Sequence, residues 1–478
     1  MTPAPSVPTP VPMPRLPDPD FGRWGQGTSL LGGWLPVGVE ILAIVILIVA
    51  IGWRTRPWRL VWVPVGAAIG VTAALGARTY MNSEGLASDP APFKLWVWTA
   101  VCGVSVAVAA LGFRGARWWR RGLSVAAIPL TLVCALTVLN QWVGYYPTLQ
   151  KAWGDLTAGP LPDQTDAKDL PNLRNTHPKT GKLVAVDIPD DASGFKHRRE
   201  YVYLPPAWFS GVVPPRLPAV LMIAGEFSNP TNWVRAGNAI PVLDNYALGY
   251  GGAAPVFVFV DSSGRFNNDT ECVDGPRGNA ADHLTKDVRP YVISQFGTSS
   301  DPSDWGVVGW SSGGTCAIDL TVMHPDLFTT FEDIGGDRGP NSGTKQQTIN
   351  RLYGGDAASW DAYDPRTVMA RHGPYGGVAG YFDDSQEPSD DKSKNLLKYL
   401  SDRRQERLAP VGFGGHGDED QFREKGALPD LCAAAMAVNI GCTLRVYTGY
   451  HTWQFGARAF ADALPWIAQR VHTPTVPD

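Results

Sequence analysis

The sequence has no excess of positive charge: 41 lysines and arginines stand against 45 aspartates and glutamates, and the formal net charge is −4. A surface that binds nucleic acid needs a basic patch, so no nucleic-acid partner is expected. The start of the chain also lacks the charged-then-apolar layout of a signal peptide. Residues 1–33 begin as a proline-rich stretch and are predicted to form a disordered tail.

Long apolar runs are abundant before residue 145. They lie at about 36–53, 60–81, 93–113 and 122–143 and contain almost no charge. Each is close to the ~20 residues that an α-helix needs to cross a bilayer core of about 30 Å. Residues 34–145 are therefore predicted to form four transmembrane helices with the lipid bilayer as their partner. Four helices buried in a large soluble core are the alternative.

The loops between these runs predict the orientation. Arginines crowd the first loop at 54–59 and the third at 114–121, whereas the second has only Lys94 at its edge. Basic loops tend to stay in the cytoplasm, so both termini are expected outside. The chain is then a multi-pass cell-membrane protein in which a linker at 146–180 leads to an extracytoplasmic domain at 181–472.

Cysteines are few and show no spacing typical of a zinc site, so neither a metal nor a cofactor is expected. Four of the six lie in the outer domain, an even number in a compartment that permits disulfides. Cys432 is predicted to pair with Cys442, because a helix leading directly into a strand can bring such neighbours together. Cys272 with Cys316 follows by elimination. Four free thiols are the alternative.

The outer domain alternates strand-like and helix-like segments. Near-continuous apolar strands separated by helices indicate a mostly parallel sheet covered on both faces, preceded by an antiparallel entry pair. In such folds catalytic groups gather at the carboxyl ends of the strands. The strands are predicted at 183–189, 199–205, 218–225, 255–264, 305–311, 328–336, 376–384 and 443–449.

One predicted strand end has the pattern of a nucleophilic serine. The stretch DWGVVGWS reads as a strand and SGGTCAIDLTVMHPDLF as a helix, so Gly309-Trp310-Ser311-Ser312-Gly313 lies at a strand-to-helix turn. This is the context that a G-x-S-x-G elbow requires, and its glycines leave room for a crowded backbone. Ser311 is the predicted nucleophile; a structural glycine turn is the alternative.

A serine nucleophile needs donors for the oxyanion and a base for its proton. The backbone N–H of Ser312 is predicted as one donor, and that of Glu226 or Phe227, in the loop after PAVLMIAG, as the other. Of the eight histidines, His451 directly follows the last strand and precedes the closing helix. That position matches the Ser, acid, His chain order of α/β-hydrolases, so His451 is the predicted base.

The acid of the triad has several candidates. Asp420, in the segment GHGDEDQF, precedes His451 with one helix between them, which is the simplest topology. Asp384 and Glu387, in GYFDDSQE, lie farther upstream and are the alternatives. The sequence therefore predicts Asp420 first and leaves the other two open.

Three segments resemble actinobacterial esterase-like proteins with several amino-terminal membrane spans, in the superfamily of esterase D and the antigen 85 mycolyltransferases. They are VVGWSSGGTCAIDL, ECVDGPRGNAADHLTKDVRPYV and GYHTWQFGARAFADALPWIAQR. The resemblance covers roughly 180–472. It implies an α/β-hydrolase fold with Ser311 and His451 as catalytic residues. The segment GDEDQF resembles esterase D and points to Asp420, whereas antigen 85 members place a glutamate differently.

Three functions fit these observations. The first is an extracytoplasmic serine carboxylesterase, which forms an acyl-enzyme from an acyl-ester or lipid-like substrate and releases it to water. The second is an acyltransferase that passes the acyl group to a hydroxyl of a sugar or lipid. The third is a noncatalytic, membrane-tethered scaffold in which the hydrolase fold only binds. The sequence favours the esterase because no feature marks an acceptor site.

Overall fold

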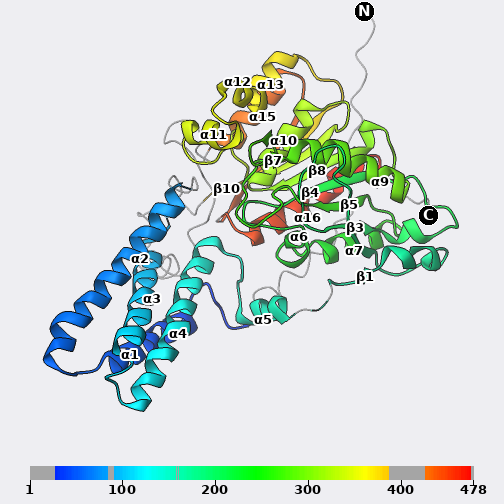
Figure 1. The fold of residues 1–478 in the computed structure, drawn as a ribbon. Helices are drawn as coiled ribbons and strands as arrows, with labels where there is room; N and C mark the ends of the chain where they lie inside the picture. Colours follow the sequence, from blue (N-terminus) through cyan, green and yellow to red (C-terminus); the bar gives the residue numbers. More distant parts are fainter. Residues whose placement is uncertain are drawn as a thin grey trace, which may run out of the picture.

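The computed structural model describes residues 27–83, 91–157, 159, 161–386, 426–449 and 451–474. Two parts are visible in Figure 1: a bundle of long helices and an α/β domain beside one of its ends. The predicted acid candidates Glu387 and Asp420 lie outside the described residues.

Within the described residues, four helices are long and apolar enough to cross a membrane, as the sequence predicted. Many of their large apolar side chains face outward, as expected of helices that lipid surrounds. The arginine-rich connections lie at the end of the bundle away from the α/β domain (Figure 1), where the guanidinium of Arg54 donates to the carbonyl of Gly112 over 2.8 Å. The helices are α1 (Trp34–Ile51), α2 (Val63–Ser83) with the preceding turn Trp58–Trp62, α3 (Phe93–Gly112) and α4 (Trp118–Val143).

In the part of the chain that the structure describes, the α/β domain is built on a nine-stranded sheet of spatial order β1-β2-β3-β5-β4-β8-β9-β10-β11. β2 pairs with β3 and β3 with β5 in antiparallel fashion, whereas all other neighbours are parallel, which confirms the predicted mostly parallel sheet. The strands are β1 (Gln164–Thr165), β2 (Lys182–Val186), β3 (Glu200–Leu204), β4 (Ala219–Ile223), β5 (Val256–Val260), β8 (Trp305–Trp310), β9 (Thr330–Ile334), β10 (Ala379–Gln386) and β11 (Gly441–Thr448).

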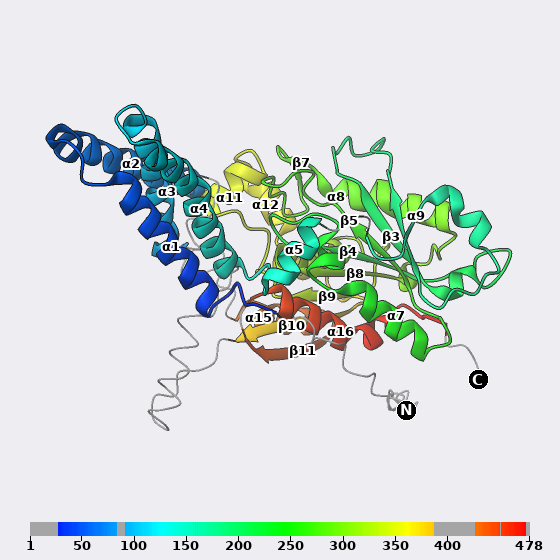
Figure 2. The ribbon, with the colours of Figure 1, turned by 90° about the horizontal axis from the view of Figure 1, so that it is seen from below.

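Helices cover both faces of this sheet. α7 and α16 pack on one face, and η5, α9, α10, α13 and α15 pack on the other, each with its own buried apolar cluster. The two layers are seen edge-on in Figure 2. The main helices are α7 (Ala239–Gly249), η5 (His283–Val288), α9 (Arg289–Phe296), α10 (Ser312–Met323), α11 (Lys345–Leu352), α12 (Ala357–Tyr363), α13 (Pro365–His372), α15 (Ala427–Ala437) and α16 (Trp453–Arg470).

The segment assigned from sequence to a linker is partly built into the domain. Residues 146–180 contain α5 (Leu149–Thr157) and β1, and β1 pairs with β2 in parallel at the edge of the sheet. β1 is only two residues long, and the sequence around it carries no apolar alternation that would mark a strand. Its pairing therefore depends on the edge that β2 offers.

Candidate active site

Ser311 lies between the end of β8 and the start of α10, where the sequence predicted a sharp turn. Its backbone angles are φ 59° and ψ −127°, a strained conformation for a residue with a side chain. The amide of Ser311 donates to the carbonyl of Ile334 on β9 over 2.9 Å, which anchors the turn to the neighbouring strand. This is the strand-turn-helix geometry of a nucleophile elbow.

The flanking glycines are required by space. A Cβ on Gly309 would lie 1.6 Å from the carbonyl oxygen of Gly313, and one on Gly313 would lie 2.4 Å from that of Ile223. Such distances are far below van der Waals contact, so neither position tolerates a side chain. The crowding that the G-x-S-x-G pattern suggested is therefore present here.

The loop after β4 passes directly beside Ser311. A Cβ on Gly225 would lie 2.8 Å from the Ser311 Cβ and 3.4 Å from its Oγ. The next residues, Glu226 and Phe227, line a small pocket together with Ser312, and Phe227 has a positive φ of 57°. Ser312 is the first residue of α10, and the first amides of a helix have no partner within the helix. The predicted oxyanion donors thus surround one pocket next to the serine.

The far wall of this pocket is polar. It is formed by the side chains of the segment after β5 and by the disulfide that joins this segment to α10. Within this wall Glu271 is 6% exposed. Burial, followed by the neighbouring charge of Asp269, raises the pKa of its carboxyl well above the ordinary range. The lining residues are Ser262, Ser263, Asn268, Asp269, Thr270, Glu271, Cys272 and Cys316.

His451 lies over the carboxyl ends of β8 and β9. Its ring stacks on Trp310, the residue before the serine, with a centroid distance of 4.2 Å and an interplanar angle of 23°. A Cβ on Gly335, which directly follows β9, would lie 2.8 Å from His451 Cε1. The amide of Ser311 bonds to Ile334, the residue before Gly335. Ser311 and the imidazole of His451 therefore both lie next to Trp310 and to the Ile334–Gly335 segment. The side chain of His451 is only 6% exposed.

Among the predicted acids, the structure describes Asp384 alone. It lies near the end of β10, opposite Val446 of β11, and is 2% exposed. β11 is the strand that leads to His451, so the two elements that carry Asp384 and His451 are adjacent in the sheet. The preceding residue, Asp383, is also buried.

Buried carboxylates collect beneath the site, a feature that the sequence analysis did not single out. Burial raises the pKa of Asp333 to about 8 and that of Asp383 to about 7, and it raises the pKa of Glu332 well above its ordinary value. Asp333 Oδ1 accepts the amide of Gly336 over 2.9 Å. The sequence did contain a signal for these buried carboxylates, because the predicted strands FTTFEDIGG and GGVAGYFDD both include acidic residues.

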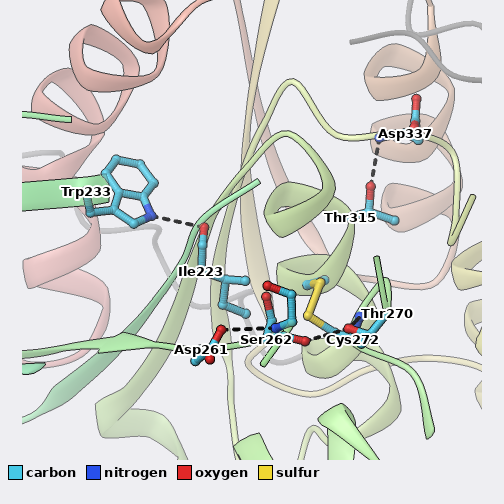
Figure 3. Close-up of a disulfide and its surroundings, with 10 residues drawn as sticks. Ile223, Trp233, Asp261, Ser262, Thr270, Cys272, Thr315 and Asp337 are labelled. Carbon is cyan, nitrogen blue, oxygen red and sulfur yellow. Dashed lines mark hydrogen bonds between the residues drawn. A yellow bond between two sulfur atoms is a disulfide. The ribbon is translucent and has the colours of Figure 1, made fainter. Parts of the chain in front are cut away.

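Both predicted disulfides are present: Cys272–Cys316, with 5.6 Å between the Cα atoms, and Cys432–Cys442, with 5.7 Å. The first ties the segment after β5 to the first turns of α10 (Figure 3). Thr270 donates its hydroxyl to the carbonyl of Ser262 over 2.6 Å in the same segment. The wall of the pocket is thus fixed covalently to the helix that follows Ser311.

One group within the described ranges has the composition of a metal-ligand set. His197, Glu200 and His283 place a ligand atom each within 4.8 Å of one another. His283 already faces Glu200 at 3.2 Å and Asp287 at 3.4 Å, and both ring nitrogens of His197 lie 2.9 Å from backbone carbonyls. Burial lowers the pKa of His283, but these two carboxylates raise it overall. We interpret the group as an internal hydrogen-bond network that joins β3 to η5.

The fold agrees with the α/β-hydrolase arrangement. When the short β1 and the hairpin β6–β7 (Asp274–Gly275 and Gly278–Asn279) are set aside, the remaining strands, renumbered along the chain, have the order 1-2-4-3-5-6-7-8. In this order the elbow follows the fifth strand and His451 follows the eighth. The position of both residues along the sheet therefore matches the Ser, acid, His succession of this fold.

The family model described as putative esterase matches residues 196–419. An uncharacterised protein of Corynebacterium glutamicum is 26% identical over 454 residues, which cover 91% of this chain and 95% of that protein.

Solved structures that resemble the chain include several esterases. A ferulic acid esterase is 18% identical with a TM-score of 0.41 and covers 61% of this chain and 99% of its own. An S-formylglutathione hydrolase from Agrobacterium tumefaciens is 18% identical with a TM-score of 0.44, covering 62% and 97%. Mycobacterium tuberculosis MPT51 is 14% identical with a TM-score of 0.38, covering 60% and 100%.

The family match lies within the α/β domain and includes the serine elbow. With four apolar helices before this domain, the chain is similar over residues 196–419 to the family described as putative esterase.

Proposed function

We propose that the chain is a membrane-anchored serine carboxylesterase that works through an acyl-enzyme. One observation carries this proposal: the strained Ser311 and the ring of His451 share Trp310 and Gly335 as neighbours at the carboxyl edge of the sheet. A hydroxyl on a strained turn beside a buried imidazole is the arrangement that acyl transfer requires.

In the proposed mechanism, Ser311 Oγ attacks the ester carbonyl while His451 takes its proton. The oxyanion accepts hydrogen bonds from the amide of Ser312 and from Glu226 or Phe227. The imidazolium then protonates the leaving alcohol, and an acyl-serine forms. Water, deprotonated by His451, attacks this acyl group and releases the acid and the free serine.

We propose Asp384 as the carboxylate that orients His451, with Asp420 and Glu387 as the alternatives. The burial of Asp384 and its place on the strand next to β11 support this assignment. A buried carboxylate at the end of this strand can hold the imidazole in the tautomer that accepts the serine proton.

Acyl transfer to a second alcohol is the other function that an observation favours. The pocket beside Ser312 is lined by hydroxyl, amide and carboxylate groups, among them Ser262, Asn268 and Asp269. Such groups can bind the hydroxyls of an acceptor and align one of them with the acyl-serine. Hydrolysis and transfer share every step up to the acyl-enzyme.

We further propose that the catalytic domain works on the extracytoplasmic side. Two observations support this: the arginine-rich loops lie at the opposite end of the helix bundle, and two disulfides occur in the α/β domain. A membrane-impermeant protease added to intact cells that produce the chain should cleave the α/β domain. If the protease cleaved the α/β domain only after the membrane was permeabilised, the extracytoplasmic placement of this domain would be contradicted.

The test of the esterase is hydrolysis of p-nitrophenyl butyrate by the purified full-length chain and by Ser311→Ala. The account predicts turnover by the native chain alone. Adding trehalose or another polyol separates the two chemistries, because an acyltransferase would then form the acylated polyol. A folded native chain without turnover or transfer would leave only the tethered scaffold.

A further inference from the structure

The outer ends of the membrane helices pack against the loop that carries the predicted oxyanion donors. Trp142, near the end of α4, is 2% exposed and shares an apolar cluster with Met81 of α2 and with Phe227. A hydrogen bond between Asn232 and the hydroxyl of Tyr145 joins the same loop region to the chain that leaves α4. The helix bundle therefore contacts a residue of the predicted oxyanion loop, Phe227.

Other contacts join the two parts around this point. The side chain of Gln454, three residues after His451, lies 3.5 Å from the carbonyl of Gly144 at the end of α4. Arg351 of α11 donates to the carbonyl of Ser83 at the end of α2. Figures 1 and 2 both show α11 beside the ends of the long helices. The face of the α/β domain that carries the site is thus the face turned towards the bundle.

The nucleophile lies close to this junction. Gly225 is in contact with Ser311, and Phe227 follows it two residues later. Two residues span at most about 7 Å of chain. The serine is therefore within roughly 10–15 Å of the point where Phe227 meets Trp142.

The junction also lies at the level of the membrane surface. α4 has 26 residues and is about 39 Å long at 1.5 Å per residue, whereas the hydrocarbon core of a bilayer is about 30 Å thick. A helix longer than the core extends into the headgroup region at its ends, and Trp142 is the second-last residue of α4. The ester bonds of membrane lipids lie in this same region.

An exposed aromatic side chain continues the apolar contact beside the bundle. Phe266 is 67% exposed, and its ring lies 5.4 Å from that of Phe227. Its neighbour Asn267 reaches Tyr80 of α2 at 3.5 Å. We call Met81, Phe227 and Phe266, the first two of which pack around the buried Trp142, the entrance strip. It runs from the helix ends to the oxyanion loop and presents an apolar edge where a lipid chain would arrive.

We propose that the acyl donor is a membrane-resident lipid ester, taken from the leaflet on the side of the catalytic domain. Its acyl chain lies along the entrance strip while its carbonyl reaches Ser311. The inference rests on the proposed function and adds the substrate class. A lipid held in this way needs to rise by only about a nanometre, and its apolar chain stays in contact with apolar side chains.

The test uses the full-length chain in proteoliposomes with a short, water-soluble ester (p-nitrophenyl butyrate) and a long-chain ester dissolved in the bilayer (p-nitrophenyl palmitate). Phe266→Ser is the variant, because this side chain is exposed and lies outside the catalytic machinery. Leu248→Ser, at a 75% exposed leucine of α7, is the matched control. We expect Phe266→Ser to lower kcat/KM for palmitate about tenfold and to leave butyrate within about twofold.

The outcomes separate the two proposals. An unchanged palmitate-to-butyrate ratio in Phe266→Ser would overturn the lipid entrance and leave the esterase intact. An equal fall of the ratio in Leu248→Ser would also overturn it, because the effect would not belong to the entrance strip. Absence of turnover of both esters by the folded native chain would instead refute the proposed function.

Discussion

At the scale of single residues, the account depends on how three side chains meet at the end of the sheet. Ser311 is held by a strained turn, Trp310 forms a platform, and the His451 ring rests on that platform against Gly335. The sequence predicted the serine and the histidine from local patterns. It gave no signal for the stacking on Trp310, because that contact joins residues far apart in the chain.

Replacing either predicted reacting group should abolish activity without unfolding the domain. We expect Ser311→Ala and His451→Ala each to lower kcat by a factor on the order of 10⁴ or more, because each removes a step that the other cannot replace. The double variant should be no worse than either single one. Steady-state kinetics with circular dichroism as a folding control measures this, and additive losses would show that the two do not act together.

Gly335→Ala should impair catalysis by displacing the imidazole. Its Cβ would lie 2.8 Å from His451 Cε1, and a shift of the ring by about 1 Å can cost about 100-fold in rate. Gly377→Ala is the matched control, since Gly377 also has a positive φ but nothing lies within 4 Å of its added Cβ. We expect both variants to lower the Tm by a similar amount and only Gly335→Ala to lower kcat. Equal kcat values would place His451 outside the site.

The identity of the acid is decided by comparing amide variants. Asp384→Asn should lower kcat by about 10³–10⁴, because the amide would hold the wrong tautomer of His451. Asp420→Asn and Glu387→Gln should each cost less than about tenfold. The reverse pattern would move the role to one of the latter two, as the resemblance to esterase D implies for Asp420.

At the scale of elements, the sequence predicted most of the strands because each is a short apolar run between turn residues. β1 was missed, since a two-residue strand has no pattern of its own and pairs only because β2 offers an edge. The elbow could be predicted because the crowded turn requires glycines at fixed positions around the serine, and this spacing is visible in the local sequence. The contact of α4 with the loop after β4 depends on tertiary packing and could not be predicted from sequence.

The two disulfides should differ in their effect on activity. Cys272 and Cys316 are separated by 44 residues and Cys432 and Cys442 by 10, which corresponds to about 4 and about 3 kcal/mol in the chain-entropy model. Replacing either pair by serine should therefore lower the free energy of unfolding. Only the Cys272–Cys316 variant should also lower kcat, because that pair fixes the wall of the pocket. Equal activity of both variants would contradict this role.

At the scale of the whole molecule, an α/β domain lies against one end of four apolar helices, and the loop with the proposed oxyanion donors lies at the junction. The sequence predicted the two parts and the long apolar runs. It did not predict that they share an apolar cluster, because an apolar pattern shows that a surface is buried and does not show which element packs against it. The proposed site at this junction is the reason that we infer a lipid ester as the substrate.

The buried carboxylates make the stability of the α/β domain depend on pH. Burial raises the pKa of Asp333 to about 8, whereas an unfolded aspartate titrates near 4. The folded state binds more protons between these values, so the free energy of unfolding falls as pH rises from about 4 to about 8. Thermal unfolding of the native chain should show a lower Tm at pH 8 than at pH 5.

Asp333→Asn should flatten this dependence, because the amide oxygen can still accept the bond from Gly336 and carries no charge to bury. Asp191→Asn, at an exposed aspartate, is the control and should leave the slope unchanged. If Asp333→Asn kept the slope of the native chain, burial of this carboxyl would not be its cause.

The central claim, that Ser311 is a nucleophile served by His451, is tested most directly by covalent labelling. The full-length chain is treated with a fluorophosphonate, digested, and the modified peptide is mapped by mass spectrometry. The account predicts one adduct on Ser311, formed rapidly in the native chain and far more slowly in His451→Ala. An adduct on another residue, or the same labelling rate without the imidazole, would contradict it.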